Sequence, residues 1–399
     1  MTGVPGASVP SSSVPGEAVP SSSVPSSSVP GASVPVPAAA AAESMAAAAS
    51  GIELRDIHVR FPLSNGLVNS LRGVPRPVVR AVDGVNLRVG RGEVVALVGE
   101  SGSGKTTLAR SLVRLLPITS GKVLLDGRDV TDISGAALRA YRRKVQIVFQ
   151  DPYESLDPRQ TVLDICAEPL DVHGLARGEE RQARVERALE EAGLSPARRL
   201  LARYPHELSG GQRQRVAIAA AMVLEPEIVV ADEPVSMLDV SLRVGILRIL
   251  LELRRTRNVG YLFITHDLSL AWLIADRICV MYLGRIVEEG PAEQVIRDPR
   301  HPYTRALLSV LPSPDPSRRR QRRLLVGETP DAARIPSGCR FYPRCPLQSE
   351  RGRTEDPPLF QVGPGHTSAC WLVEHGEQLP PLPELDGALT PPAPAAGTE

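Results

Sequence analysis

The fold is decided by residues 94–106, which read Val94-Val-Ala-Leu-Val-Gly-Glu-Ser-Gly-Ser-Gly-Lys105-Thr106. The run Val94–Val98 is continuously apolar, as expected for a strand buried on both faces of a sheet. The next eight residues match the phosphate-binding pattern G-x-x-x-x-G-K-[ST], which lies between a strand and a helix. Glycines let backbone N–H groups surround an anion, and the helix beginning at Lys105 directs its positive end there. We expect Lys105 to reach the β- and γ-phosphates and the Thr106 hydroxyl to bind Mg²⁺. The candidate phosphate-binding residues are Gly99, Glu100, Ser101, Gly102, Ser103, Gly104, Lys105, Thr106 and Thr107.

A second stretch places two carboxylates at the end of a buried strand. Residues 228–231 are apolar and are followed by Asp232, Glu233 and Pro234. Ligands bind at the carboxyl ends of strands in a parallel sheet, so both acids should face the phosphate-binding loop. Asp232 suits Mg²⁺, directly or through water, and Glu233 suits the general base that activates the attacking water.

Strands and helices alternate along the central part of the chain. We predict strands at 52–61, 81–89, Val94–Val98, 146–149, 228–231 and 261–265. We predict helices at 108–116, 179–192, 211–224 and Val240–Arg257. This alternation favours an α/β domain with a mostly parallel sheet.

Composition limits the possible partners and compartment. The 399 residues carry 46 basic and 45 acidic side chains, for a net charge of +1, so nothing indicates a nucleic-acid partner. No stretch reaches the roughly 18–20 apolar residues that span a bilayer, and the N-terminus lacks the pattern of a secretory signal. The five cysteines form no even framework, so we expect a reduced, cytosolic protein. Any membrane role must come through partners.

Four further motifs resemble those of the ABC ATPase family. Leu208-Ser-Gly-Gly-Gln212 lies between Lys105 and Glu233 in the chain and is identical to the family signature LSGGQ; alone, S-G-G would only indicate a helix cap. Gln150 resembles the Q-loop glutamine, Ser236-Met-Leu-Asp239 resembles the D-loop, and His266 resembles the switch histidine. The resemblance covers about residues 52–297 and implies a P-loop NTPase fold with a helical subdomain.

The resemblance implies ATP hydrolysis with Mg²⁺ by two ATPase domains paired head to tail. It implies a γ-phosphate contact for His266 and a Mg²⁺ ligand role for Gln150. The candidate residues that close over the ATP held by the partner are Ser209, Gly210, Gly211, Gln212 and Asp239. The family normally stacks an aromatic on adenine just before the strand starting near residue 81. This sequence has Pro77-Val-Val-Arg80 there, so we assign adenine stacking to Phe61, the nearest earlier aromatic.

Three segments resemble the oligopeptide/dipeptide (peptide/nickel-type) importer subfamily. These are the Q-loop at 149–158, His301-Pro-Tyr-Thr-Arg-Ala-Leu-Leu, and Gly338-Cys-Arg-Phe-Tyr-Pro-Arg-Cys-Pro346. The Q-loop is nearer to the F-type partner of such ATPase pairs. The resemblance implies a second, different ATPase subunit, two membrane permease subunits and an extracytoplasmic solute-binding protein. It places the chain peripherally on the cytoplasmic face of the cell membrane and leaves the solute open. The alternatives are a soluble ABC ATPase acting in translation or DNA repair, and an exporter half.

The expected domains follow from these motifs and from composition. Residues 1–50 are a Val-Pro pentad repeat without aromatic or basic residues, which we expect to be disordered. The ABC ATPase domain should span 51–299, with its helical subdomain at about 151–215 touching the permease. A small C-terminal domain should follow at 300–375, including a cluster of arginines, and then a disordered proline-rich tail at 376–399.

The cysteines raise the question of a metal cluster. Cys339, Cys345 and Cys370 lie in the C-terminal segment, residues 300–375, and some relatives hold an iron–sulfur cluster there with a fourth cysteine. No cysteine lies between Leu347 and Arg353, and such clusters usually need four thiolates. We therefore expect reduced, partly buried thiols. Cys166 and Cys279 lie in apolar surroundings and should belong to the core.

Overall fold

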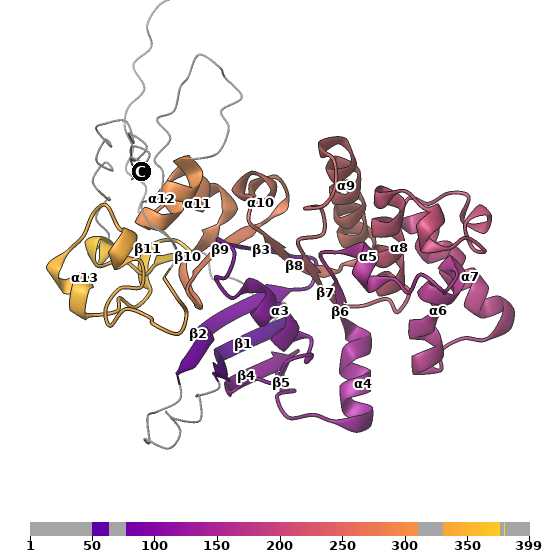
Figure 1. Ribbon diagram of the computed structural model, residues 1–399, viewed down its shortest axis with the longest axis horizontal. Coiled ribbons are helices and arrows are strands. Elements are labelled where there is room, and N and C mark those ends of the chain that lie inside the picture. Colours follow the sequence, from indigo (N-terminus) through magenta and orange to yellow (C-terminus); the bar gives the residue numbers. More distant parts are fainter. Residues whose placement is uncertain (1–49, 64–76, 310–329, 376–378, 380–399) are drawn as a thin grey trace, which may run out of the picture. The chain divides into compact units, whose positions relative to one another are not determined.

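The computed structural model describes residues 50–63, 77–309, 330–375 and 379 (Figure 1). Its strands are β1 Gly51–Pro62, β2 Val78–Gly90, β3 Val94–Val98, β4 Ser120–Leu125, β5 Arg128–Asp129, β6 Val145–Val148, β7 Ile228–Asp232, β8 Gly260–Thr265, β9 Arg277–Tyr282, β10 Arg285–Pro291, β11 Phe360–Gly363 and β12 His366–Ser368. Its α-helices are α3 Lys105–Leu112, α4 Gly135–Lys144, α5 Pro152–Ser155, α6 Val162–His173, α7 Gly178–Glu191, α8 Gly210–Met222, α9 Val240–Arg257, α10 Leu268–Ile274, α11 Ala292–Arg297, α12 Pro302–Ser309 and α13 Glu350–Thr354. The Val-Pro repeat, the arginine cluster and nearly all of the proline-rich tail lie outside the described residues.

The central sheet has the strand order β11-β12-β10-β9-β3-β8-β7-β6. From β9 to β6 every neighbouring pair is parallel. β3 lies between β9 and β8, and all five of its residues are buried. A strand covered on both faces needs the unbroken apolar run that the sequence shows. The predicted α/β fold with a mostly parallel sheet is confirmed.

A second, antiparallel sheet was not predicted from the sequence. Its strand order is β2-β1-β4-β5, and β1 pairs with both β2 and β4. Side chains from β1 and β2, including Ile52 and Val82, share a hydrophobic core with Leu108 of α3 and Val95 of β3. Figure 1 shows α3 between the two sheets. Strand alternation identified β1 and β2, but it carries no information about which sheet a strand joins.

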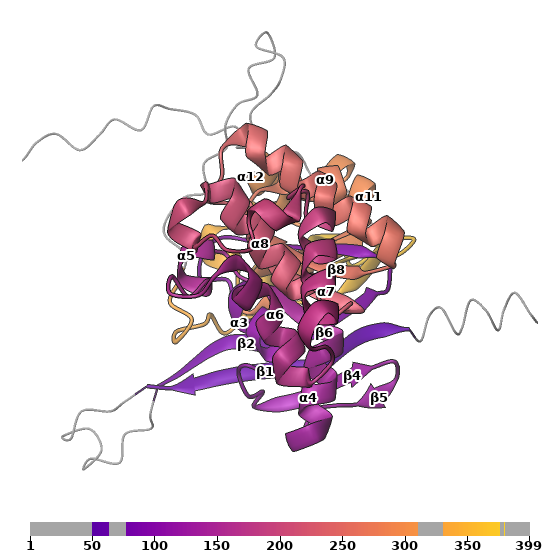
Figure 2. The same ribbon diagram turned by 90° about the vertical axis from the view of Figure 1, so that its right-hand side faces the viewer.

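Helices α5 to α8 form a group that Figure 2 shows facing the viewer. α6 is bounded by Thr161, whose side chain accepts a hydrogen bond from the Asp164 N–H, and by Gly174 at φ 64°. These are the expected start and stop signals of a helix, because each satisfies or relieves the unpaired groups at that end. The apolar faces of α6, α7 and α8 share one core that continues to β7.

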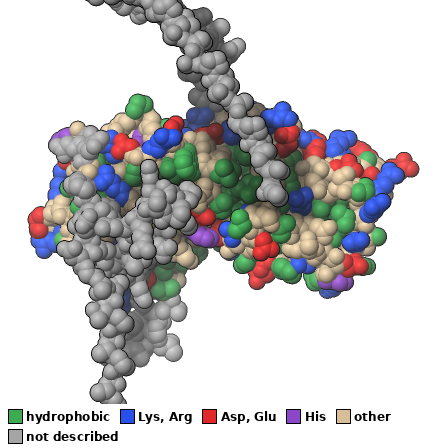
Figure 3. Space-filling view, turned by 90° about the horizontal axis from the view of Figure 1, so that it is seen from above, with side chains coloured by type: hydrophobic (Ala, Val, Ile, Leu, Met, Phe, Trp, Pro, Cys, Tyr) green, Lys and Arg blue, Asp and Glu red, His purple; other side chains and the backbone are tan. Residues whose placement is uncertain are grey.

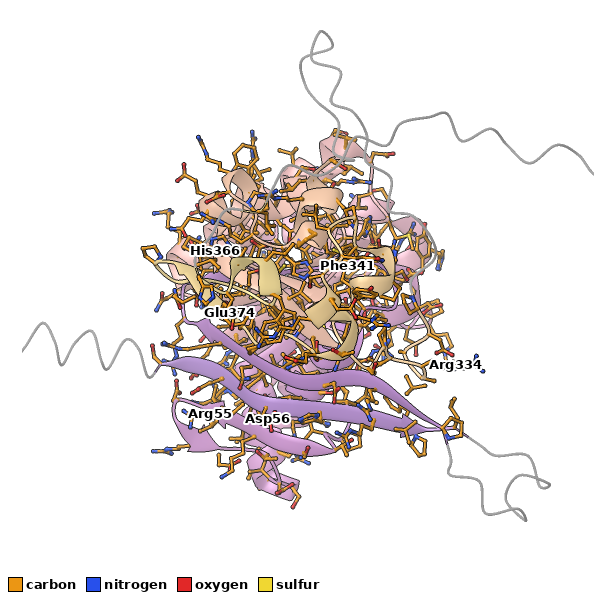
Figure 4. The ribbon with its side chains drawn as sticks, turned by 90° about the vertical axis from the view of Figure 1, so that its left-hand side faces the viewer. Arg55, Asp56, Arg334, Phe341, His366 and Glu374 are labelled. Atoms are coloured by element: carbon orange, nitrogen blue, oxygen red, sulfur yellow. The ribbon has the colours of Figure 1, made fainter. Side chains whose placement is uncertain are left out.

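The C-terminal segment is built into the central sheet. β12 pairs with β10, and Phe341 packs in the core against Tyr282 and Tyr303. Figure 4 shows Phe341 and His366 on this segment, above the strands of the antiparallel sheet. The domain boundaries at 300 and 375 stay a prediction, but the described part of this segment shares both sheet and core with the rest.

The structure also bears on the two core cysteines, on the end of the helix after the phosphate-binding loop and on membrane-spanning helices. Cys166 and Cys279 are fully buried, as predicted. Helix α3 ends at Leu112 rather than near residue 116, because the chain turns at Arg114, which has a positive φ of 60°. In the part of the chain that the structure describes, no helix has the length and apolar character to cross a membrane.

Candidate functional site

The phosphate-binding loop connects β3 to α3 and passes very close to other backbone. A Cβ atom on Gly104 would lie 2.1 Å from the carbonyl oxygen of Ala81, and Gly104 also has φ 105°. A Cβ atom on Gly99 would lie 2.2 Å from the carbonyl oxygen of Met281. Only glycine fits these positions, so the sequence pattern has a direct steric cause.

Lys105 is buried beneath this loop. Its Nζ donates to the carbonyl oxygens of Gly99 at 2.8 Å and Glu100 at 2.9 Å, and lies 3.4 Å from the Ser103 hydroxyl. Burial lowers the pKa of Lys105, and the nearby acid Glu233 opposes that shift. The Lys105 ammonium group is therefore held by oxygen atoms of the loop, and phosphate oxygens could take their place.

The two acids at the end of β7 have different surroundings. Asp232 is buried, and the Thr106 hydroxyl donates to its Oδ1 at 3.3 Å. Burial raises the pKa of Asp232, while the hydrogen bond from Thr106 opposes the shift. Glu233 has φ 47°, and its N–H donates to the carbonyl oxygen of Ile264 at 3.0 Å, which fixes the turn after the strand.

Glu233 also brings two other predicted residues together. Its Oε2 accepts from Gln150 Nε2 at 3.3 Å and lies 3.1 Å from His266 Nδ1. The three side chains follow β7, β6 and β8, whose carboxyl ends meet at one edge of the sheet. Motifs far apart in the sequence thus form one cluster beside the phosphate-binding loop.

A cavity of about 830 Å³ opens above this cluster. Its lining includes most of the predicted phosphate-binding loop, together with Gln150, Glu233 and His266. An apolar side of the cavity comes from residues that the sequence analysis missed: Val79, Ala81, Ala306, Leu307 and Ala332. The last three belong to the C-terminal segment. Two of them, Ala306 and Leu307, lie in the motif His301-Pro-Tyr-Thr-Arg-Ala-Leu-Leu, which was the sequence signal that could have identified them.

Phe61 is not among the residues that line this cavity. It lies on β1 opposite Val79 of β2, and Val79 lines the cavity. Which residues two neighbouring strands present to a site depends on their register, and the register between β1 and β2 could not be predicted from the sequence. Within the described residues, the structure does not support adenine stacking by Phe61.

The signature residues lie elsewhere. The Ser209 hydroxyl accepts from the Gln212 N–H at 3.3 Å, and the Gln212 side chain accepts from the Ser209 N–H at 3.0 Å, so the two form a capping box on α8. Ser209, Gly211 and Gln212 line a separate hollow of about 390 Å³. Asp239 precedes α9 as its N-cap. None of these signature residues lines the cavity at the phosphate-binding loop.

The C-terminal cysteines are free thiols with different exposure. Cys370 is buried, and Cys339 and Cys345 are half-buried. Burial raises the pKa of Cys345 to about 11 and that of Cys370 to about 12. The expectation that they bind no iron–sulfur cluster stays a prediction.

Comparisons with known proteins agree with this geometry. Residues 82–236 match the family model described as ABC transporter, and residues 287–351 match "Oligopeptide/dipeptide transporter, C-terminal region". A putative peptide import ATP-binding protein of Brucella ovis is 48% identical over 292 residues, covering 73% of this chain and 92% of the relative. The oligopeptide transport ATP-binding protein AppF of Bacillus subtilis is 43% identical over 324 residues, covering 80% of this chain and 97% of the relative.

A solved structure extends the similarity to the fold. The dimeric, post-hydrolysis ATP-binding cassette MJ0796, bound to ADP and Pi, is 31% identical to this chain with a TM-score of 0.53. The match covers 60% of this chain and 98% of that one. The relatives from Brucella ovis and Bacillus subtilis are named as ATP-binding proteins of peptide import and oligopeptide transport, which rules against the alternative of a soluble ATPase in translation or DNA repair. The chain belongs to the ABC transporter family: it is an ATP-hydrolysing importer subunit, and it carries the oligopeptide/dipeptide transporter C-terminal region.

Proposed function

We propose that this chain binds Mg-ATP in the cavity above β7 and powers the import of oligopeptides, dipeptides or a related solute. The observation that carries the proposal is the convergence of Lys105, Glu233 and His266 on one cavity at the carboxyl edge of the sheet, with the buried Asp232 bonded to Thr106 of its lining. Peptides are the solute class because the relatives from Brucella ovis and Bacillus subtilis are named for peptide import.

The residues divide the chemistry among them. Lys105 exchanges its loop carbonyl partners for β- and γ-phosphate oxygens. Glu233 orients the attacking water and accepts its proton, and His266 contacts the γ-phosphate. The hydrogen bonds from Gln150 and His266 to Glu233 hold that carboxylate at the mouth of the cavity.

The donor set also fits a magnesium ion. The Thr106 hydroxyl and the Asp232 carboxylate lie 3.3 Å apart, and Gln150 lies across the same cavity. Such hard oxygen ligands are the ones that Mg²⁺ prefers. When bound, Mg²⁺ would neutralise charge on the β- and γ-phosphates.

The apolar side of the cavity suits the nucleobase. Val79 and Leu307 provide surface that an adenine ring can cover, in place of the aromatic side chain expected from the sequence. The C-terminal segment therefore contributes directly to nucleotide binding.

A second ATPase subunit completes the site. The start of α8 does not line the chain's own cavity and is formed by Ser209, Gly210, Gly211 and Gln212. Asp239, the N-cap of α9, does not line it either. The N-terminus of a helix is a good anion site, so this surface closes over ATP held by a partner. The exposed hydrophobic residues that suit such contact include Met237, Val240, Leu242, Val244, Trp272 and Leu273. Separately, Figure 3 shows hydrophobic side chains gathered near the middle of the face seen from above.

The rest of the assembly follows from the importer subfamily. We propose a heterodimer in which this chain is the F-type subunit, bound at the cytoplasmic face to two permease subunits. The helices at about 151–215 contact the permease, and an extracytoplasmic binding protein delivers the solute.

Nucleotide binding by the purified chain tests the site. Lys105→Ala removes a phosphate contact, so equilibrium binding of a fluorescent ATP analogue with Mg²⁺ should weaken by at least about tenfold. Lys144→Ala, which removes an exposed lysine paired with Glu227, is the control and should bind as the wild type does. Equal affinity of the Lys105→Ala and wild-type chains would refute the proposed site.

A further inference from the structure

Two residues of the C-terminal segment contact one residue of the phosphate-binding loop. The backbone N–H of Glu100 donates to the Tyr303 hydroxyl at 2.9 Å. The Glu100 carboxylate is paired at both oxygens with Arg344, whose Nη1 and Nη2 lie 2.7 Å and 3.2 Å away. Glu100 itself lines the cavity proposed for ATP. Main chain and side chain of the second loop residue are therefore both held from outside the loop.

Tyr303 is a rigid contact. Its side chain is fully buried, with ring centroids 4.7 Å from Tyr282 and 5.4 Å from Phe341. Its own N–H donates to Nδ1 of the buried His301 at 3.1 Å. The motif that opens the C-terminal segment thus fixes the hydroxyl that receives the loop N–H.

Arg344 is equally constrained. Its side chain is 7% exposed, and its guanidinium lies over the Tyr282 ring at 5.9 Å from the centroid. It ends a short 3₁₀ turn, Tyr342–Arg344, next to Phe341. A planar guanidinium paired at two points has little freedom, so it fixes the direction of the Glu100 carboxylate as well as its charge.

We propose that Arg344 and Tyr303 are positioning residues of the nucleotide site, which set the phosphate-binding loop through Glu100. The inference rests on the proposed ATP site. A carboxylate on the cavity wall would repel a polyphosphate, and repulsion is strong where water is partly excluded. Arg344 neutralises that carboxylate, and the Tyr303 hydroxyl holds the adjacent backbone, so the C-terminal segment determines how well ATP binds.

The charge of Arg344 should affect ATP binding more than ADP binding. Arg344→Gln removes the guanidinium charge that pairs with the Glu100 carboxylate and so strengthens the repulsion of the phosphates. The affinity for ATP should therefore fall about tenfold, and the loss for ADP should be smaller because ADP carries less charge. Adding Glu100→Gln to Arg344→Gln removes the repelling charge and should restore most of the affinity. Arg344→Lys keeps the charge without the two-point pairing, and should lie between the wild type and Arg344→Gln.

The experiment measures dissociation constants of the full chain for fluorescent ATP and ADP analogues, with thermal melting to verify folding. Arg340→Gln is the matched control, because Arg340 is equally buried in the same segment but pairs with Asp83 of β2. It should change the melting temperature and leave the ATP dissociation constant unchanged. Tyr303→Phe keeps the ring and removes the acceptor, and should weaken ATP binding about fivefold.

The possible outcomes separate two failures. The inference is supported if Arg344→Gln loses more affinity for ATP than for ADP and the double variant with Glu100→Gln recovers the ATP affinity. Equal ATP affinity of wild type, Arg344→Gln and Tyr303→Phe overturns it, as does a loss that Glu100→Gln fails to reverse. If the wild type binds ATP no better than Lys105→Ala does, the proposed ATP site itself fails.

Discussion

The phosphate-binding cavity and the signature at the start of α8 differ in how complete each is within one chain. At the cavity, Lys105 bonds to the loop carbonyl of Gly99 and Thr106 bonds to Asp232. Gln150 and His266 both contact the Glu233 carboxylate. At α8, Ser209 and Gln212 cap each other, and Ser209 is exposed to solvent. The chain thus prepares its catalytic groups but leaves the signature helix open to another molecule.

This difference explains how hydrolysis can be made dependent on assembly. A γ-phosphate facing solvent has its charge stabilised by mobile water rather than by fixed dipoles, so the transition state is poorly stabilised. In the proposed dimer, closure by a partner's signature would supply those dipoles and exclude water. Association, rather than nucleotide binding, then becomes the step that permits turnover.

The largest expected effect concerns the base. Glu233→Gln keeps the shape and the hydrogen bond to Gln150 but removes the proton acceptor, so ATPase of the assembled complex should fall by about 10²–10⁴ while ATP still binds. Steady-state phosphate release and nucleotide binding check this. Turnover near the wild-type rate would show that another group is the base.

The next effect concerns the open surface. Ser209→Arg places a long cation at the start of α8, so hydrolysis in the partner's site should drop at least about tenfold, whereas ATP binding by this chain should persist. Ser349→Arg, which alters the N-cap of α13, is the control. The comparison breaks down if Ser209→Arg abolishes this chain's own nucleotide binding.

A smaller effect should come from the apolar wall. Leu307→Asp places a charge against the nucleobase, so KM for ATP should rise about tenfold with little change in kcat. Leu359→Asp, also in the C-terminal segment but outside this cavity, should leave KM unchanged. An unaltered KM in Leu307→Asp would show that the nucleobase does not bind against Leu307.

The smallest effect is a pH dependence of stability. Burial lowers the pKa of His301 to about 3, whereas an unfolded histidine titrates near pH ~6.5. Between these values only the unfolded chain binds the proton, so stability falls as pH drops through this window, by up to ~1.4 kcal/mol per pH unit. His301→Asn should lower stability at pH 8 and flatten this slope in urea unfolding. An unchanged slope would mean that His301 is not the group responsible.

Much of the site could be predicted because its motifs have local physical causes. The glycines of the loop, the acids after β7 and the capping box at Ser209 each follow from short-range sterics or hydrogen bonding. That both acids face the phosphate-binding loop also followed, since parallel strands bring their carboxyl ends together. Gln150 and His266 were identified instead by the resemblance to the ABC ATPase family.

The missed features depend on long-range packing. The separate antiparallel sheet and the lining of the cavity by Val79 and Leu307 both require knowing which distant segments meet. The same holds for Arg344, whose partner Glu100 is 244 residues earlier in the chain. No periodicity or motif spacing encodes such a pairing.

The most direct test of the shared-site account is ATPase activity measured against protein concentration, for this chain alone and with its candidate partner and permease subunits. The account predicts low activity for the chain alone and full activity when the partner and permease are present. Activity that rises with concentration but ignores the partner would indicate a homodimer that still shares its sites. Full activity of the chain alone, independent of concentration, would contradict the central claim that the signature of one subunit completes the site of another.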